Sequence, residues 1–383
     1  MNSSELKFAF ARNPIMVTKT WTPAGPENDL RYGVVKVAYA GADVFEGRFT
    51  SPLQIDLGGI AAACAKYLPD ASASTGVSRL KSLSDIPKLT ARFTINGVTE
   101  TVERVIIPGG VSSQNFAVYA AENTDAFDSR FLASTGNFFL TTRTSGWQIL
   151  IPETELYPLF FLASSAFTLV VQDAVSGYQR SISIIAGFWS LDINGMRRWF
   201  MEQHGVLPSV FNIIRAGKTA CQIVVTRQEA APERYRLKFR NSLGVFEVVS
   251  LKGALKIQPS LGDEDSSYRE FNQVTRQWAA RRQRPVRTMA FSIESGICNE
   301  SMRSMEDMLL SDEVYLLDLY DQPVRVIPTV ENMSYDALIK QPERFGFKFE
   351  LADEETMIMP EISGADSSKR PGLFSRQFDK HFN

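Results

Sequence analysis

The segment Arg344–Leu351 constrains the fold more than any other part of the chain. Polar or small residues separate its four apolar residues, which are Phe345, Phe347, Phe349 and Leu351. Successive side chains of a strand point to opposite faces, so this period of two predicts a strand with one buried face. Such a strand needs neighbours in a sheet and a second layer that covers its apolar face.

The preceding residues predict both the neighbours and the cover. Alternating apolar residues predict three more strands, at residues 287–293, 314–320 and 322–327. Residues 299–310 change to a helical period, with Met302, Met305 and Leu309 on one stripe. We therefore expect residues 286–356 to form a C-terminal domain in which one helix packs on an antiparallel sheet.

The longer N-terminal part of the chain has many short apolar segments separated by turn residues. Asn96-Gly97 lies between two alternating segments and predicts a hairpin, because both residues adopt the left-handed conformation of a type I′ turn readily. Ala40-Gly41-Ala42 marks a second hairpin. Short helices are expected only at residues 60–67 and 195–204.

These patterns predict a mostly β protein of two antiparallel β-sandwich-like domains, the C-terminal one with a single helix packed on its sheet. Residues 1–258 form the N-terminal β-rich region, with room for two subdomains, and residues 259–285 form a linker or helix. Residues 357–383 form an extended tail. Residues 69–85 are rich in Ala and Ser and have few large apolar residues, so we expect a mobile loop there.

The composition limits the classes of partner. The net charge of −2 gives no electrostatic reason to expect nucleic acid or an anionic membrane as partner. No apolar run approaches the roughly 20 residues of a membrane-spanning helix. The first residues lack an apolar segment, so we expect no signal peptide. Cys64, Cys221 and Cys298 are widely spaced, which predicts neither a disulfide framework nor a metal site.

Motifs that suggest chemistry are incomplete. Gly217-Lys218-Thr219 resembles the end of a phosphate-binding loop, but Asn212 stands where that motif needs a glycine, and a strand is expected next. The acidic run Asp263-Glu264-Asp265 lacks the spacing of an EF-hand loop, so it is interpreted as a charged linker. The two histidines, His204 and His381, are interpreted as solvated residues. We therefore expect no catalytic residue, cofactor or metal, and predict that the chain is not an enzyme.

One group of basic residues is a candidate interaction site. It contains Trp278 and the arginines Arg276, Arg281, Arg282, Arg284 and Arg287. Guanidinium groups bind phosphate and stack on bases, so one interpretation is a surface for anions or nucleic acid. The other is an exposed helix whose arginines pair with nearby acids or with a neighbouring subunit. The near-neutral charge of the chain favours the second interpretation and disfavours nucleic acid.

The C-terminal tail carries a second candidate interaction site. Phe374, Phe378 and Phe382 recur every four residues, so a short helix would place them on one face. An isolated helix of this length is marginal in water and needs a surface that covers its apolar face. We expect that surface to belong to a neighbouring subunit or partner.

Two segments carry a resemblance to a known group of proteins. In the first, a strand precedes a helix that ends in Leu309-Leu310-Ser311-Asp312-Glu313-Val314, and a further strand leads to Asp321-Gln322-Pro323 and the alternating strand at the end. This order resembles the core domain of tail and baseplate proteins of tailed bacteriophages, with the distal-tail family nearest. The second segment, Tyr235–Gly253, is similar to a hairpin in structural proteins of phages and prophages of gut bacteria.

The resemblance implies a structural role without catalytic residues. Such a protein works in a symmetric ring, with copies of itself and other tail components as partners, as a virion component assembled in the bacterial cytoplasm. The alternative is a carbohydrate-binding or adhesion module, because these modules are also built on β-sandwiches. Trp21, Trp147 and Trp189 gathered on one groove would favour that alternative.

Overall fold

The computed structural model divides the chain into two compact units. The first unit consists of residues 1–228 and 240–247, and the second of residues 229–239 and 248–383. The described residues are 8–22, 32–71, 76–113, 116, 138–215, 217–228, 234–261, 267–282, 287–297, 299–317, 323–329 and 343–352. Among them, no helix is long and apolar enough to cross a membrane.

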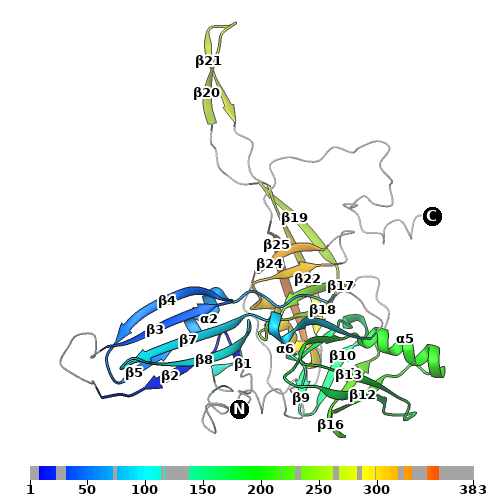
Figure 1. Ribbon diagram of the computed structural model, residues 1–383. Coiled ribbons are helices and arrows are strands. Elements are labelled where there is room, and N and C mark those ends of the chain that lie inside the picture. The colour runs from blue at the N-terminus through cyan, green and yellow to red at the C-terminus, as the bar shows by residue number, and fades with distance from the viewer. Residues whose placement is uncertain are drawn as a thin grey trace. The chain divides into compact units, whose positions relative to one another are not determined.

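The first unit contains a five-stranded sheet with a smaller sheet and a helix against it (Figure 1). In spatial order its strands are β1 (Phe8–Phe10), β8 (Val98–Ile107), β7 (Lys88–Ile95), β3 (Gly33–Tyr39) and β4 (Ala42–Phe49). The smaller sheet pairs β2 (Met16–Lys19) with β5 (Leu53–Asp56), and helix α2 (Gly58–Cys64) follows. Val37, Phe93 and Ala61 are fully buried in the core that these elements share.

Both predicted hairpins are confirmed. Strands β3 and β4 join at Ala40 (φ 51°) and Gly41 (φ 86°), and strands β7 and β8 join at Asn96 (φ 50°) and Gly97 (φ 77°). Two consecutive residues in the left-handed region give a type I′ turn, whose twist matches that of the two strands it joins. The local turn sequences therefore favour the pairing of β3 with β4 and of β7 with β8.

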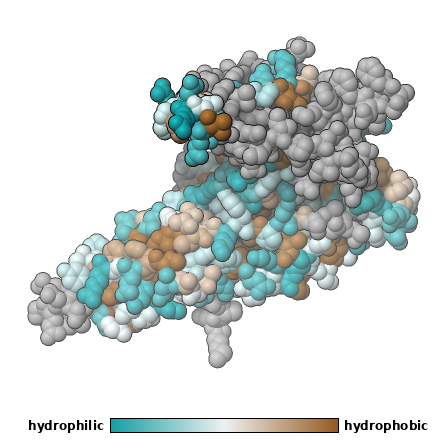
Figure 2. Space-filling model, turned by 90° about the horizontal axis from the view of Figure 1, so that it is seen from above, coloured by the Kyte–Doolittle hydropathy of each residue, from teal (hydrophilic) through white to brown (hydrophobic). Residues whose placement is uncertain are grey.

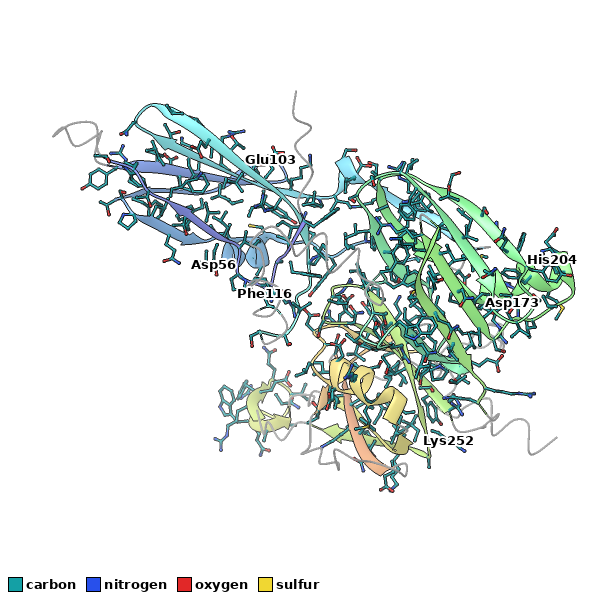
Figure 3. The ribbon with its side chains drawn as sticks, turned by 90° about the horizontal axis from the view of Figure 1, so that it is seen from below. Asp56, Glu103, Phe116, Asp173, His204 and Lys252 are labelled. Atoms are coloured by element: carbon teal, nitrogen blue, oxygen red, sulfur yellow. The ribbon has the colours of Figure 1, made fainter. Side chains whose placement is uncertain are left out.

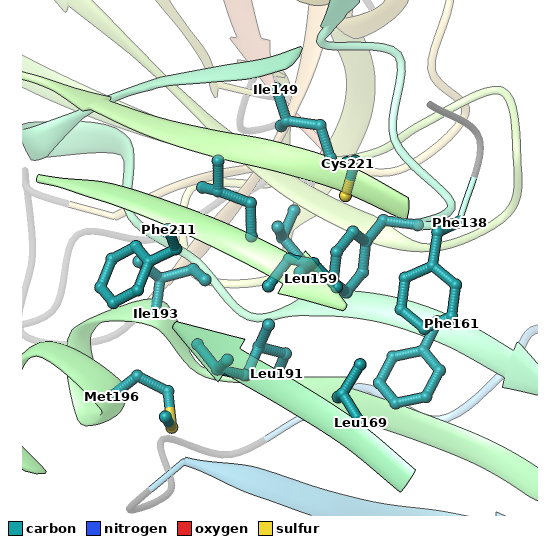
Figure 4. Packing of buried hydrophobic residues seen from close by; sticks show 14 of the residues in the cluster. Phe138, Ile149, Leu159, Phe161, Leu169, Leu191, Ile193, Met196, Phe211 and Cys221 are labelled. Carbon is teal, nitrogen blue, oxygen red and sulfur yellow. The ribbon is translucent and has the colours of Figure 1, made fainter. Parts of the chain in front are cut away.

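A second pair of sheets and a helix complete the first unit. The six-stranded sheet has the order β13 (Gln179–Ile184), β12 (Phe167–Asp173), β15 (Val210–Arg215), β16 (Lys218–Thr226), β10 (Gln148–Pro152) and β9 (Thr144–Ser145). The three-stranded sheet has the order β11 (Leu159–Ala163), β14 (Gly187–Leu191) and β6 (Val77–Ser82). Their shared core contains an aromatic group, in which the rings of Phe138 and Phe161 stack with centroids 4.8 Å apart (Figure 4).

Helix α5 (Ile193–His204) confirms the helix predicted near residue 195. The Asp192 carboxylate accepts a hydrogen bond from the Gly195 N–H (3.0 Å) and so caps the first turn. The helix ends at Gly205, whose φ of 70° is the left-handed conformation that favours glycine at this position. Met196 and Phe200 are fully buried and attach the helix to the core.

Three segments of the first unit differ from the prediction. Strand β6 and the 3₁₀ helix η1 (Leu83–Asp85) occupy most of the expected loop at 69–85, because pairing with β14 and burial of Leu83 outweigh the low apolar content. Residues 72–75 of that segment lie outside the described residues. The apolar residues at 138–142 predict a strand, but Phe138–Leu140 are buried and form bends. Two strand pairs, β1 with β8 and β10 with β16, are parallel.

The second unit is built on a seven-stranded sheet. Its order is β18 (Phe246–Lys252), β17 (Arg234–Arg240), β23 (Val314–Leu316), β24 (Val324–Thr329), β25 (Glu343–Leu351), β22 (Arg287–Ile297) and β19 (Leu255–Leu261). A separate hairpin consists of β20 (Ser267–Asn272) and β21 (Gln277–Arg282). The predicted boundary at residue 258 is too late, because β17 and β18 contribute to this sheet.

Helix α6 (Asn299–Leu309) packs on one face of the seven-stranded sheet, as the sequence predicts. Met302, Met305 and Met308 are buried in one core with Phe347 and Phe349. This arrangement confirms the predicted strand–helix–strand–strand–strand order and the mostly β, largely antiparallel fold class.

The turn between β17 and β18 packs in the first unit. The Asn241 Oδ1 accepts hydrogen bonds from the N–H groups of Leu243 and Val245, both at 3.1 Å, and so defines the turn. Its Nδ2 donates to the Leu140 carbonyl (3.0 Å). The Gly110 N–H donates to the Ser242 carbonyl (2.7 Å), which brings the turn against the chain after β8.

Arg143 bridges two carboxylates inside the first unit. Its Nη1 lies 2.7 Å from Glu155 Oε2, and its Nε lies 3.4 Å from Glu247 Oε2; the three side chains are 3%, 1% and 6% exposed. Glu247 also accepts hydrogen bonds from the Asn241 side chain (2.7 Å) and the Thr142 N–H (3.2 Å). Buried carboxylates are tolerated only with such partners, so this cluster fixes the β17–β18 turn and the short 3₁₀ helix η2 (Glu153–Glu155).

Gly109 packs against the turn between β17 and β18. Substitution of Gly109 by Ala should destabilise the first unit by about 1–3 kcal/mol, because the added methyl group overpacks the contact with this turn. A Cβ at residue 109 would lie 2.2 Å from the carbonyl carbon of Leu243 and 2.3 Å from the Ser242 carbonyl oxygen. Both are backbone atoms that cannot rotate away. Urea unfolding followed by tryptophan fluorescence measures the loss.

Gly59→Ala is the matched control for that substitution. Gly59 is exposed in α2, and its Cβ would meet no atom within 4 Å. We expect this change to leave stability unaltered or to raise it by up to about 1 kcal/mol, since alanine is the better helix residue. Equal stabilities for Gly109→Ala and the unsubstituted chain would show that the turn does not pack as described.

Candidate interaction surface

The hairpin of β20 and β21 is here called the arm (residues 267–282). It lies in the sequence between β19 and β22, two strands that pair with each other. Leu261 at the end of β19 pairs with Arg287 at the start of β22, so the chain leaves and re-enters the sheet at one place. Between these residues the arm forms a two-stranded sheet of its own (Figure 1). The arm is therefore an insertion at one end of the β19–β22 pair.

Local sequence explains why the arm is a hairpin. The Asn272 Oδ1 accepts hydrogen bonds from the N–H groups of Val274 (2.9 Å) and Thr275 (3.3 Å), which bends the chain after β20. Arg276 has a φ of 51°, and this left-handed residue returns the chain into β21. Both features lie within the arm itself.

The arm is exposed and carries large apolar side chains. Every residue from 269 to 280 is exposed, with Phe271 at 45%, Trp278 at 66% and Val274 at 92%. Phe271 and Trp278 are direct partners across the two strands, with ring centroids 5.3 Å apart. Elsewhere exposed apolar residues are scattered, and on the face in Figure 2 hydrophobic and hydrophilic residues interleave. The arm concentrates three such residues within eight positions.

The two faces of the arm differ in chemistry. Side chains of paired residues lie on the same face of an antiparallel ladder, and residues two apart share a face. Arg269 is therefore on the face of Phe271 and Trp278, and Glu270 is on the opposite face. One face joins an aromatic pair to an arginine, a combination typical of protein–protein interfaces.

An isolated two-stranded hairpin is at best marginally stable in water. Its four arginines and one glutamate give the arm a net charge of +3. The arm is therefore an exposed aromatic pair inside a basic hairpin whose residues 269–280 are all exposed, and exposed apolar patches of this kind commonly mark interaction sites.

The prediction of a linker or helix at 259–285 is wrong for the arm, which is a hairpin. Arg276 lies in its turn and Trp278 on β21, both exposed. Arg281 and Arg282 lie in β21, where they pair with Tyr268 and Ser267. Arg287 is the first residue of β22. The remaining predicted site residues are outside the described residues; these are Arg284, Phe374, Phe378 and Phe382.

Three functional candidates on the arm were not predicted from the sequence. They are Arg269, Phe271 and Val274. The sequence carries one signal for them, because an aromatic residue, Phe271, and Trp278 lie on either side of a turn that begins with Asn272. The register that pairs these two residues can be assigned only once the turn is known.

Gly217-Lys218-Thr219 and Cys221, two of the candidates for chemistry in the sequence, have structural explanations. Gly217, with a φ of 77°, forms the turn between β15 and β16, so Gly217-Lys218-Thr219 leads into a strand as predicted. Burial raises the pKa of the Cys221 thiol to about 12, which keeps it protonated and unreactive. Asp263-Glu264-Asp265, Cys298 and His381 lie outside the described residues. In the described part of the chain, no three His, Cys, Asp or Glu residues lie where they could hold a metal ion.

A second aromatic group lies at the end of α5 in the first unit (Figure 3). The rings of Tyr178 and His204 stack with centroids 4.2 Å apart, and Trp199 meets His204 edge-on at 5.5 Å. The Arg180 guanidinium lies 4.8 Å from the Trp199 ring. His204 is an exposed residue at a helix end, as predicted, and the group packs this end of α5 on β13 and its preceding turn.

The tryptophans that would favour a carbohydrate-binding module do not share an exposed face. Trp189 is 8% exposed, and its Nε1 donates to the Ile185 carbonyl (2.8 Å) in one core. Trp21 is half-buried against another core, and Trp147 is 48% exposed. No observation on these three residues supports a sugar-binding groove.

Comparison with known proteins gives no identification. No protein-family model matches the chain, and a search of curated proteins finds no significant relative.

Proposed function

We propose that the protein is a structural component that assembles with copies of itself, as a tail or baseplate protein of a tailed bacteriophage or prophage does. The observation that carries this proposal is the arm, a hairpin with an aromatic pair and four arginines, in which residues 269–280 are all exposed. Its work is to present a surface to a neighbouring subunit.

The order of elements in the second unit supports the same proposal. Strand β22, helix α6 and strands β23, β24 and β25 follow one another as in the core domain that the sequence resembles. The hairpin of β17 and β18 lies where the second resembling segment predicts it. In a ring of identical subunits each copy offers one surface and accepts the complementary one, so an uncovered hairpin and a compact sheet are suitable parts.

Light scattering across a concentration series tests this function. We expect the mass of the purified chain to rise from one copy at low concentration to a fixed multiple at high concentration, because a closed ring has a defined number of subunits. Raised salt should weaken assembly, since the arm is charged. A chain that stays monomeric at all concentrations and at low salt would contradict self-assembly.

A further inference from the structure

The acceptor for the arm follows from the distribution of charge in the second unit. Outside the arm, this unit holds 16 basic and 23 acidic residues, a net charge of −7, against +3 for the arm. Every described residue from 269 to 280 is exposed, so the described part of the chain does not cover these residues. A second copy of the chain carries the same excess of acidic residues.

The densest acidic segment of the described residues is the end of α6 and the turn after it, here called the acidic turn (residues 306–313). It contains Glu306, Asp307, Asp312 and Glu313 and no lysine or arginine. Leu310 is 79% exposed within it. The partial negative charge at the C-terminus of a helix adds to the attraction for cations here.

The arm and the acidic turn are complementary in both charge and polarity. The arm carries exposed Phe271 and Trp278 together with exposed Arg269 and Arg276, and the acidic turn carries exposed Leu310 and Asp312 with half-buried Glu306 and Glu313, while Asp307 is buried. The acidic turn is ordered: the Leu310 N–H donates to the Glu306 carbonyl (3.1 Å), and the Tyr315 hydroxyl donates to Glu313 Oε1 (2.7 Å). An ordered acceptor loses less conformational entropy on binding.

We propose that the arm of one copy binds the acidic turn of the next copy, which makes this contact the link of the assembly. The inference rests on the proposed function and names the two surfaces that perform it. The contact is head-to-tail, because a copy gives its arm on one side and receives an arm on its acidic turn. Nucleic acid fits less well, because the rest of the same unit has a net charge of −7, which disfavours a polyanionic partner.

Two charge-reversed variants of the full chain test this link. The arm-reversed variant carries Arg269→Glu and Arg276→Asp, and the turn-reversed variant carries Glu306→Arg and Asp312→Arg. Each alone brings like charges together, so the concentration at half-assembly should rise roughly thirtyfold or more, the effect of losing an interface hot spot. Arg92→Glu, a reversal at an exposed residue of β7 in the first unit, is the control that should assemble normally.

An equimolar mixture of the two variants is the decisive sample. Each reversed arm then meets a reversed turn, and each original arm meets an original turn, so the mixture should assemble although neither variant does. Phe271→Ala with Trp278→Ala should also weaken assembly, while Trp147→Ala, which truncates an exposed tryptophan elsewhere, should not.

The outcomes separate this inference from the proposed function. If the unsubstituted chain assembles and both reversed variants assemble equally well, or the mixture stays monomeric, the arm–turn link is wrong and self-assembly stands. If the unsubstituted chain never assembles, the proposed function itself is wrong. Salt-sensitive binding of a single-stranded oligonucleotide that the arm-reversed variant loses, with assembly unchanged, would assign the arm to nucleic acid and overturn the inference.

Discussion

Arg143→Met should destabilise the first unit by about 3–5 kcal/mol, the usual cost of leaving a buried charge without its partner. The substitution keeps most of the volume of the side chain but removes the cation between Glu155 and Glu247, which lie 2.7 and 3.4 Å from it. Both carboxylates are almost fully buried, so water cannot replace the guanidinium. Urea unfolding followed by tryptophan fluorescence measures the effect, because Trp21, Trp147, Trp189 and Trp199 all lie in the first unit.

Arg92→Met controls for the loss of an arginine as such. Arg92 is exposed on β7 in the same unit, so we expect a change within about 0.5 kcal/mol. A loss below about 1 kcal/mol for Arg143→Met would mean that the two carboxylates are solvated or otherwise compensated. The β17–β18 turn would then be held by other contacts, such as the hydrogen bonds of Asn241 and the Gly110–Ser242 hydrogen bond.

Phe347→Ala should destabilise the second unit by about 3–5 kcal/mol, because it removes a large buried ring and leaves a cavity. Phe347 is 3% exposed and pairs with Ile293 of β22, and its ring stacks on that of Phe349 at 6.3 Å. Hydrogen exchange read by mass spectrometry measures the effect locally, as faster exchange of the β22 and β25 amides.

Ile327→Ala is the matched truncation on the same sheet. Ile327 lies on β24 and is 56% exposed, so its loss should change exchange in β22 and β25 very little. Equal effects of the two substitutions would contradict the assignment of the Phe347 face to the core. The alternation of apolar and polar residues in Arg344–Leu351 would then not indicate a strand with one buried face.

Elements with one buried face could be predicted from the sequence. The alternation in β25 and the helical stripe of α6 reflect burial against one core, and the turns at Asn96-Gly97 and Ala40-Gly41 reflect local backbone preferences. Strand β6 was missed because its side chains are exposed or half-buried, so no period marks it. Its pairing with β14 is a tertiary effect that local sequence does not encode.

The arm was only partly predictable for the same physical reason. Arg276 and Trp278 were selected by residue type, but the hairpin was not, because neither face of the arm is buried and alternation is therefore weak. Phe271 and Arg269 become candidates only through the register that places Phe271 opposite Trp278. The cluster of Arg143, Glu155 and Glu247 joins residues far apart in sequence, which no local pattern predicts.

Imaging the assembled species by negative-stain electron microscopy tests self-assembly most directly. A head-to-tail contact between arm and acidic turn generates a ring when its rotation closes. We predict particles with one rotational symmetry, which break up into single copies in the arm-reversed variant. Open filaments of varied length, or single copies alone even at the highest concentration imaged, would contradict a closed ring built through the arm.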